Sequence, residues 1–106
     1  MDKVILVYST TPDMNTAEKI AEQLVGEKLA ACVSMMPSVQ SVYRWQGTIE
    51  KASEVALMIK TTQQLFSALS EKLVAIHPYD VPELVAVPVV DGLPSYLQWV
   101  QDETAS

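Results

Sequence analysis

ACVSMMPSVQSVYRWQGTIEKASEVALMIK, residues 31–60, is the stretch that predicts the fold. From Ala31 to Trp45 the chain follows the period of two that is typical of a β-strand. Gln46-Gly47 is a turn signal, and Thr48 to Lys60 predicts a returning strand. Pro37 cannot donate a ladder hydrogen bond, so we expect a bulge, a bend or a sheet edge at that position. The segment therefore predicts a long β-hairpin.

The predicted hairpin is too long for a compact monomer. A strand from Ala31 to Trp45 would measure about 45 Å at roughly 3.3 Å per residue. A compact domain of this length has a diameter of about 33 Å, so the hairpin should project beyond its own sheet. A projecting edge with Tyr43 and Trp45 is an aggregation hazard unless something covers it. We expect a neighbouring subunit to cover it, with Tyr43 and Trp45 at the interface.

Outward from the hairpin, hydrophobic periodicity predicts two more strands and three helices. The expected elements are a strand at Val4–Tyr8, a helix through residues 17–25, a helix through residues 65–76, a strand at Glu83–Val90 and a helix at Pro94–Asp102. Thr61 to Gln64 predicts a capping box at the start of the second helix. The order β-α-β-β-α-β predicts an α+β, ferredoxin-like sandwich with both main helices on one face of a four-stranded antiparallel sheet. Without repeats or linkers, residues 1–106 are expected to form a single domain.

Composition excludes several classes of protein. With 49% hydrophobic and 19% charged residues, the chain is not intrinsically disordered. A formal net charge of −6 disfavours nucleic acid as a partner. No apolar stretch is long enough to predict a membrane span, and the first residues lack the basic region of a signal peptide. The single cysteine fits a reducing compartment, so we expect a cytoplasmic protein.

The segment from His77 to Glu83 concentrates polar groups between two prolines. It carries an imidazole, the phenol of Tyr79 and two carboxylates, and loops of this kind on a rigid sheet are common binding sites. His77 ends a predicted helix, which favours a capping role over a metal or acid–base role. Lys60 stands where a strand meets a helix and could receive an anion. Glu54 is interpreted as an exposed charge on the hairpin.

Sulfur-containing residues and catalytic pairs give weaker signals. Cys32 lies among apolar residues, which predicts a buried and unreactive thiol. Met35 and Met36 point to opposite faces of a strand, so core packing is a simpler interpretation than a copper(I) site. No nucleophile–base pair is visible, so we expect a protein that is not an enzyme.

Taken together, the motifs resemble the CutA divalent-cation tolerance proteins, from about Val4 to Val100. The motifs that carry the resemblance are Thr11-Pro12-Asp13, Glu27-Lys28-Leu29-Ala30-Ala31-Cys32-Val33, Tyr43-Arg44-Trp45-Gln46-Gly47, Lys60-Thr61, His77-Pro78-Tyr79-Asp80-Val81-Pro82-Glu83 and Tyr96-Leu97-Gln98-Trp99. The resemblance implies a ferredoxin-like protomer in a tight homotrimer, whose long hairpins interlock around the three-fold axis. It also implies an architecture similar to that of PII signalling trimers.

The resemblance implies a metal site that this sequence only partly keeps. Copper-binding members use a cysteine and two adjacent histidines at the positions that hold Ser9, Ile76 and His77 here. A hydroxyl and an isoleucine cannot replace a thiolate and an imidazole for a soft metal, so only weak binding of copper or another divalent cation at His77 is expected. No cofactor is certain. Two functions stay open: a metal-tolerance trimer, or a PII-like signalling or anchoring trimer that binds a small anion or a protein. The cleft residues expected between subunits are Lys60, Tyr79, Glu83 and Trp99.

Overall fold

The computed structural model describes residues 2–105 and has four strands and three α-helices within them. The elements are β1 (Val4–Thr11), α1 (Met14–Gly26), β2 (Cys32–Trp45), β3 (Thr48–Thr62), a short 3-10 helix η1 (Gln63–Leu65), α2 (Phe66–Ile76), β4 (Leu84–Pro88) and α3 (Pro94–Thr104). No helix within residues 2–105 is long and apolar enough to cross a membrane.

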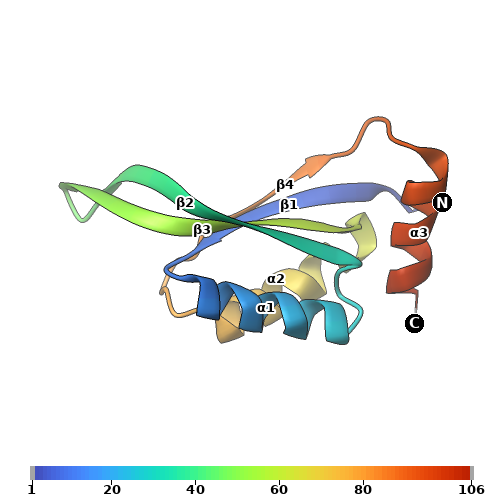
Figure 1. The fold of residues 1–106 in the computed structure, drawn as a ribbon, viewed down its shortest axis with the longest axis horizontal. Coiled ribbons are helices and arrows are strands. Elements are labelled where there is room, and N and C mark those ends of the chain that lie inside the picture. The colour runs from blue at the N-terminus through green and yellow to red at the C-terminus, as the bar shows by residue number, and fades with distance from the viewer. Residues whose placement is uncertain (1, 106) are drawn as a thin grey trace.

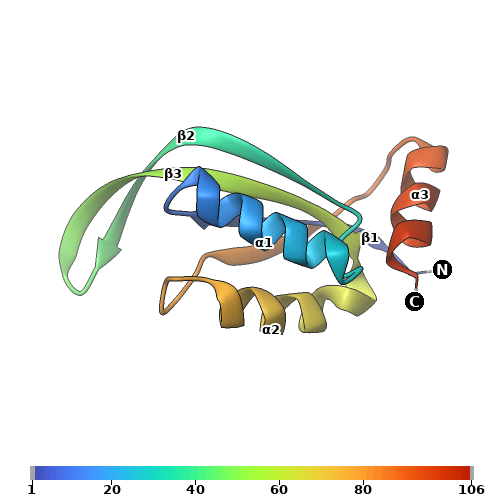
Figure 2. The ribbon, with the colours of Figure 1, turned by 60° about the horizontal axis from the view of Figure 1, so that its bottom comes forward.

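The strands form one antiparallel sheet in the order β2-β3-β1-β4 (Figure 1). This is the order that two interlocked β-α-β units produce. Helices α1 and α2 lie side by side on one face of the sheet, and α3 stands apart at one end of it (Figure 2). The predicted α+β sandwich with a C-terminal helix is therefore confirmed.

The main core lies between the sheet and the helix pair α1 and α2. Odd-numbered residues of β1 and β3 fill it from the sheet, and the apolar stripes of α1 and α2 fill it from the other side. Its buried members include Ile5, Val7, Val55, Leu57 and Ile59 from the strands and Ile20, Leu24, Leu69 and Leu73 from the helices. Because side chains alternate along a strand, the even-numbered residues of β1 and β3 point away from the helices. We call that side of the sheet the open face.

The long hairpin projects from the sheet as predicted. β1 pairs with β3 only from Val55 onward, so the tip-side half of β3 has only β2 as its neighbour. The molecule measures 44 × 25 × 22 Å, and the free half of the hairpin forms one end of its long axis (Figure 1). At the tip, Gln46 and Gly47 have φ values of 49° and 81°, which suits a tight hairpin turn. The register shifts between Met36 and Val39, so the irregularity expected at Pro37 is a β-bulge.

The start of the second helix differs from the prediction. Thr61 and Thr62 belong to β3, and the Thr61 hydroxyl donates to the carbonyl of Leu29 at 2.7 Å. Thr62 is the N-cap residue of η1, but its side chain makes no capping hydrogen bond. The predicted capping box is therefore wrong, because pairing with β1 continues through Thr62 and commits Thr61 to the sheet.

Candidate functional site

The predicted site residues lie in two groups at opposite ends of the open face. Lys60 and Glu54 are both even-numbered residues of β3, whose odd-numbered neighbours fill the core. They therefore point to the same side of the sheet, about 20 Å apart at roughly 3.3 Å per residue. Lys60 lies at the end that α3 covers, because Val100 of α3 packs there on Val4 and Ala31.

The first group, which we call the lysine group, consists of Cys32, Ser34, Lys60, Tyr96 and Trp99. Lys60 Nζ donates to Ser34 Oγ at 2.6 Å and lies 3.7 Å from Cys32 Sγ. Burial raises the pKa of Tyr96, and the neighbouring Cys32 raises it further. The rings of Tyr96 and Trp99 lie 5.7 Å apart, so Trp99 belongs to the same end of the sheet. Cys32 is only half-buried, which falls short of the full burial that its apolar neighbours predicted.

The second group, the glutamate group, consists of Tyr8, Thr10, Glu54, Tyr79 and Glu83. The Tyr79 hydroxyl donates to Glu54 Oε2 at 2.9 Å. Glu54 is only 6% exposed, so the interpretation of this residue as an exposed hairpin charge is wrong.

Burial and the carboxylates of the glutamate group raise the pKa values of its two half-buried phenols. Burial raises the pKa of Tyr79, and the hydrogen bond and the charge of Glu54 raise it further. The pKa of Tyr8 is raised by burial first and then by the charges of Glu83 and Glu54. An acidic environment stabilises the neutral phenols because ionising them would place like charges together.

His77 connects the loop after α2 to the end of β1. Its side chain is 8% exposed, and Nε2 lies 2.7 Å from the carbonyl oxygen of Thr10. The backbone N–H of Tyr79 donates to Nδ1 at 3.1 Å. A carbonyl only accepts and an N–H only donates, so the ring carries its proton on Nε2. Both nitrogens are therefore engaged, and His77 can coordinate a metal only after one of these hydrogen bonds breaks.

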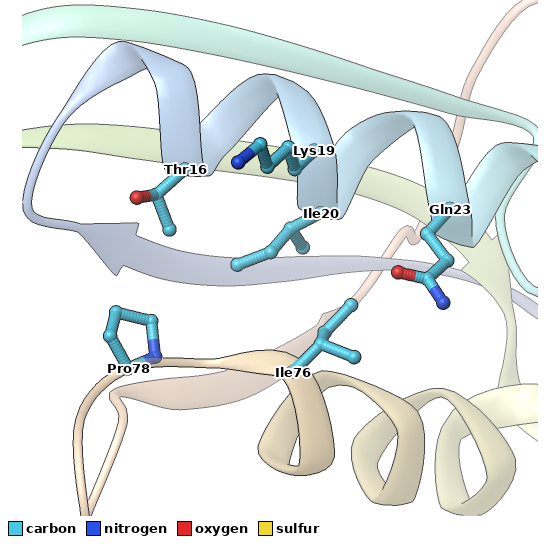
Figure 3. A pocket seen from close by; sticks show the side chains of 6 residues that line it. All are labelled: Thr16, Lys19, Ile20, Gln23, Ile76 and Pro78. Carbon is cyan, nitrogen blue, oxygen red and sulfur yellow. The ribbon is translucent and has the colours of Figure 1, made fainter.

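Ser9 and Ile76 occupy the two other positions of the copper site that the resemblance implied. Ser9 is fully buried, and its hydroxyl donates to the carbonyl of Glu83 at 2.6 Å. Ile76 lines a groove between α1 and α2, where it faces Ile20 and lies close to Pro78 (Figure 3). Both residues have structural contacts, and neither supplies a metal ligand.

Within residues 2–105, neither a cluster of metal ligands nor either of the two main grooves brings the predicted residues together. Residues 2–105 contain no group of three or more His, Cys, Asp or Glu side chains that could hold a metal ion. A groove of about 300 Å³ lies between α1 and α2, and a wider one of about 620 Å³ lies beside α3, but neither is lined by Lys60, Tyr79, Glu83 or Trp99.

Sequence reasoning missed Glu54, Ser34 and Tyr8 as members of these groups. The signal that could have found Glu54 is its spacing from Lys60, since an even separation along a strand puts both on one face. Its burial was not visible in the sequence, because the side chains that cover it come from distant segments. The predicted interface residues Tyr43 and Trp45 lie at the hairpin tip and are each 45% exposed.

Comparison with known proteins agrees with this fold. The family model described as CutA1 divalent ion tolerance protein matches residues 5–103. The divalent-cation tolerance protein CutA of Thermus thermophilus is 44% identical over 104 residues, which are 98% of this chain and 99% of that protein. The chloroplastic protein CutA of Arabidopsis thaliana is 45% identical over 100 residues, and this chain spans only 55% of its length.

A solved structure gives the same result for the fold. The crystal structure of CutA from Xylella fastidiosa superimposes with a TM-score of 0.95 at 48% identity, covering 97% of this chain and 99% of that one. Family and fold thus agree along nearly the whole length of the chain. The chain belongs to the CutA1 divalent ion tolerance protein family.

Proposed function

We propose that the chain acts in divalent-cation tolerance as a homotrimer whose functional site lies between protomers. The open face carries exposed apolar side chains on its edge strand, with Val85 52% and Val87 50% exposed. On the projecting hairpin Val42 and Ile49 are 66% and 62% exposed, but they lie on the other face of the sheet, because Ile49 is odd-numbered and Val42 pairs with Lys51. Exposed apolar surface of this extent is typical of an interaction site, and a second copy of the chain is the occupant proposed here.

The observation that carries the proposal is the separation of Lys60 from Glu54 on one face. Two groups about 20 Å apart cannot form one site within a protomer. They can meet when the lysine end of one protomer faces the glutamate end of the next, which is the head-to-tail contact that closes into a ring. Their charges are complementary, since an ammonium group would face the carboxylates of Glu54 and Glu83. This arrangement unites Lys60, Tyr79, Glu83 and Trp99 in one intersubunit cleft.

We propose that copper binds weakly at His77 in this assembly. The ring must first release the Tyr79 N–H or the Thr10 carbonyl, which costs a buried hydrogen bond. The nearby donors are carboxylate and phenol oxygens, which suit hard cations better than copper. The protein is proposed to be cytoplasmic and not an enzyme.

A PII-like trimer that binds a small anion or a protein partner is the second candidate. The engaged ring nitrogens of His77 favour it, as does the absence of a three-ligand metal cluster within residues 2–105. In this version the Lys60 ammonium, held by Ser34, receives the anion.

Sedimentation of dilute protein tests the assembly. The expected mass is three times 11.7 kDa. Trp45→Ser should weaken association, whereas Val74→Ser is a matched control because Val74 is a half-exposed residue of α2, on the other side of the sheet from the open face. A monomeric wild-type protein would contradict the proposal.

A double-mutant cycle tests whether the two groups meet. Within one protomer, the effects of Lys60→Gln and Glu54→Gln on the free energy of unfolding should be additive, because residues more than about 10 Å apart seldom couple. In the assembled protein we expect a coupling of roughly 0.5 kcal/mol or more in the free energy of unfolding. Additive effects in a confirmed trimer would place the two groups in separate sites.

Calorimetric titration with copper separates the two candidate functions. Weak binding that disappears in His77→Ala and persists in Cys32→Ser supports the metal site. Binding that survives His77→Ala would place the metal elsewhere, and no binding by a folded trimer would favour the PII-like candidate.

A further inference from the structure

The groove between α1 and α2 lies apart from the lysine and glutamate groups, and its lining differs from theirs in chemistry. It belongs to the helical layer, on the far side of the sheet from the open face (Figures 2 and 3). Its volume of about 300 Å³ is at the lower end of the range for ligand pockets. Covering the open face with other protomers would leave this layer available.

The groove has an apolar floor and a polar rim. Ile20 of α1 faces Ile76 at the end of α2, and the ring of Pro78 closes one end (Figure 3). The rim comes from Thr16, Lys19 and Gln23, and the spacing of three and four residues puts them on one side of α1. A hydroxyl, an ammonium and an amide thus follow one another along about 10 Å of helix.

Lys19 is the charged member of the rim. Within residues 2–105 the ion pair at salt-bridge distance joins Lys72 to Glu27, so the Lys19 ammonium has no such partner in that range. The hydrogen bonds from Thr16 are the main cause of the lowered pKa of Asp13, and the charge of Lys19 lowers that pKa further. Its ammonium is therefore available to a ligand and would repel a cationic one.

We propose that this groove binds a small monocarboxylate with an apolar body. The carboxylate accepts from Lys19 and Gln23, and the hydrocarbon part covers Ile20, Ile76 and Pro78. A single negative charge matches the single lysine, whereas a multiply charged anion would meet the repulsion of a chain with net charge −6. Because the groove is small and open to solvent, we expect a dissociation constant on the order of millimolar.

The groove is connected to the glutamate group through its own wall. Ile76 and Pro78 are the sequence neighbours of His77, which hydrogen-bonds to Thr10 and Tyr79. A ligand that touches both neighbours should therefore change the environment of the His77 ring and of the Tyr79 amide. This gives the binding a spectroscopic signature away from the ligand itself.

Amide chemical-shift titration with hexanoate tests the proposal on isotope-labelled protein. We expect saturable shifts in residues 16–23 and 76–79, with smaller effects from equal concentrations of hexanol and hexylammonium. Lys19→Gln should weaken hexanoate binding about twofold to fivefold, the upper part of the range for an exposed ion pair, while Lys19→Arg should retain it. Lys28→Gln is the matched control, because it removes the same charge beyond the end of α1.

Three results would overturn the proposal. One is linear, unsaturable shifts, another is hexanol binding as tightly as hexanoate, and the third is equal weakening by Lys28→Gln and Lys19→Gln. The amide spectrum of each variant shows at the same time whether it is folded.

Discussion

The hydrogen bond from Tyr79 to Glu54 predicts a stability effect that depends on pH in a definite direction. Tyr79→Phe removes the hydroxyl that donates to Glu54 Oε2 at 2.9 Å and leaves the ring in place. Glu54 is 6% exposed, so its carboxylate regains little water when the donor is lost. Hydrogen bonds to charged groups contribute about 1.5–3 kcal/mol, and partial screening at the half-buried phenol lowers our expectation to about 1–2 kcal/mol at pH 8.

The alkaline pH dependence follows from the raised pKa of the Tyr79 phenol. A group with a raised pKa in the folded state contributes its full stability below the unfolded value, here about 10, and loses it as pH rises. Above that pH the unfolded chain releases the phenolic proton while the folded chain retains it, so the stability of the wild type falls. Because Tyr8 and Tyr96 also have raised pKa values, the one-proton limit of about 1.4 kcal/mol per pH unit applies to the slope of the difference between wild type and Tyr79→Phe. Tyr79→Phe lacks this contribution, so the difference between the two proteins should shrink above pH 10.

Urea unfolding followed by circular dichroism measures both quantities at fixed protein concentration, because association would otherwise shift the midpoint. Tyr96→Phe is the matched control at pH 8, since the Tyr96 hydroxyl makes no hydrogen bond within residues 2–105 and Tyr96 lies at the opposite end of the sheet from Glu54. A difference between wild type and Tyr79→Phe that is smaller than about 0.5 kcal/mol at pH 8, or that does not change with pH, would refute the reasoning.

Three further predictions test the backbone, a buried hydroxyl and the thiol. Gly47→Ala should destabilise the protein by about 1 kcal/mol, because Gly47 has a φ of +81° that alanine rarely adopts. Gly26→Ala lies in a helix and should be neutral or stabilising. Measured melting temperatures should therefore fall for Gly47→Ala but not for Gly26→Ala. Thr61→Val should cost about 1–2 kcal/mol in urea unfolding by leaving the Leu29 carbonyl without its donor, and a loss no larger than that of Thr48→Val would contradict it. A thiol reagent should label Cys32 more slowly in the native protein than in urea, and equal rates would mean that its surroundings give no protection.

Local sequence patterns were sufficient to predict most of the fold. The alternation between Ala31 and Lys60 predicted the hairpin and its overhang, because side-chain period follows directly from backbone geometry. Element boundaries were less predictable, as Thr61 shows. The Thr61 hydroxyl can cap a helix or form a hydrogen bond outside the helix. In the fold it donates to the carbonyl of Leu29, which belongs to a distant segment of the chain.

The burial, hydrogen bonding and relative positions of the candidate site residues depend on the tertiary structure. The sequence by itself identified His77, Tyr79, Glu83, Lys60 and Trp99 as notable, since residue type and local spacing are properties of the sequence. It did not determine that Glu54 is buried, that both nitrogens of His77 are engaged, or that Lys60 lies at the opposite end of the sheet from Tyr79. Burial and hydrogen bonding at these residues arise from segments far apart in the chain, and His77 and its partner Thr10 are separated by 67 positions in the sequence. Such contacts exist only after the strands have paired, so only the folded chain decides them.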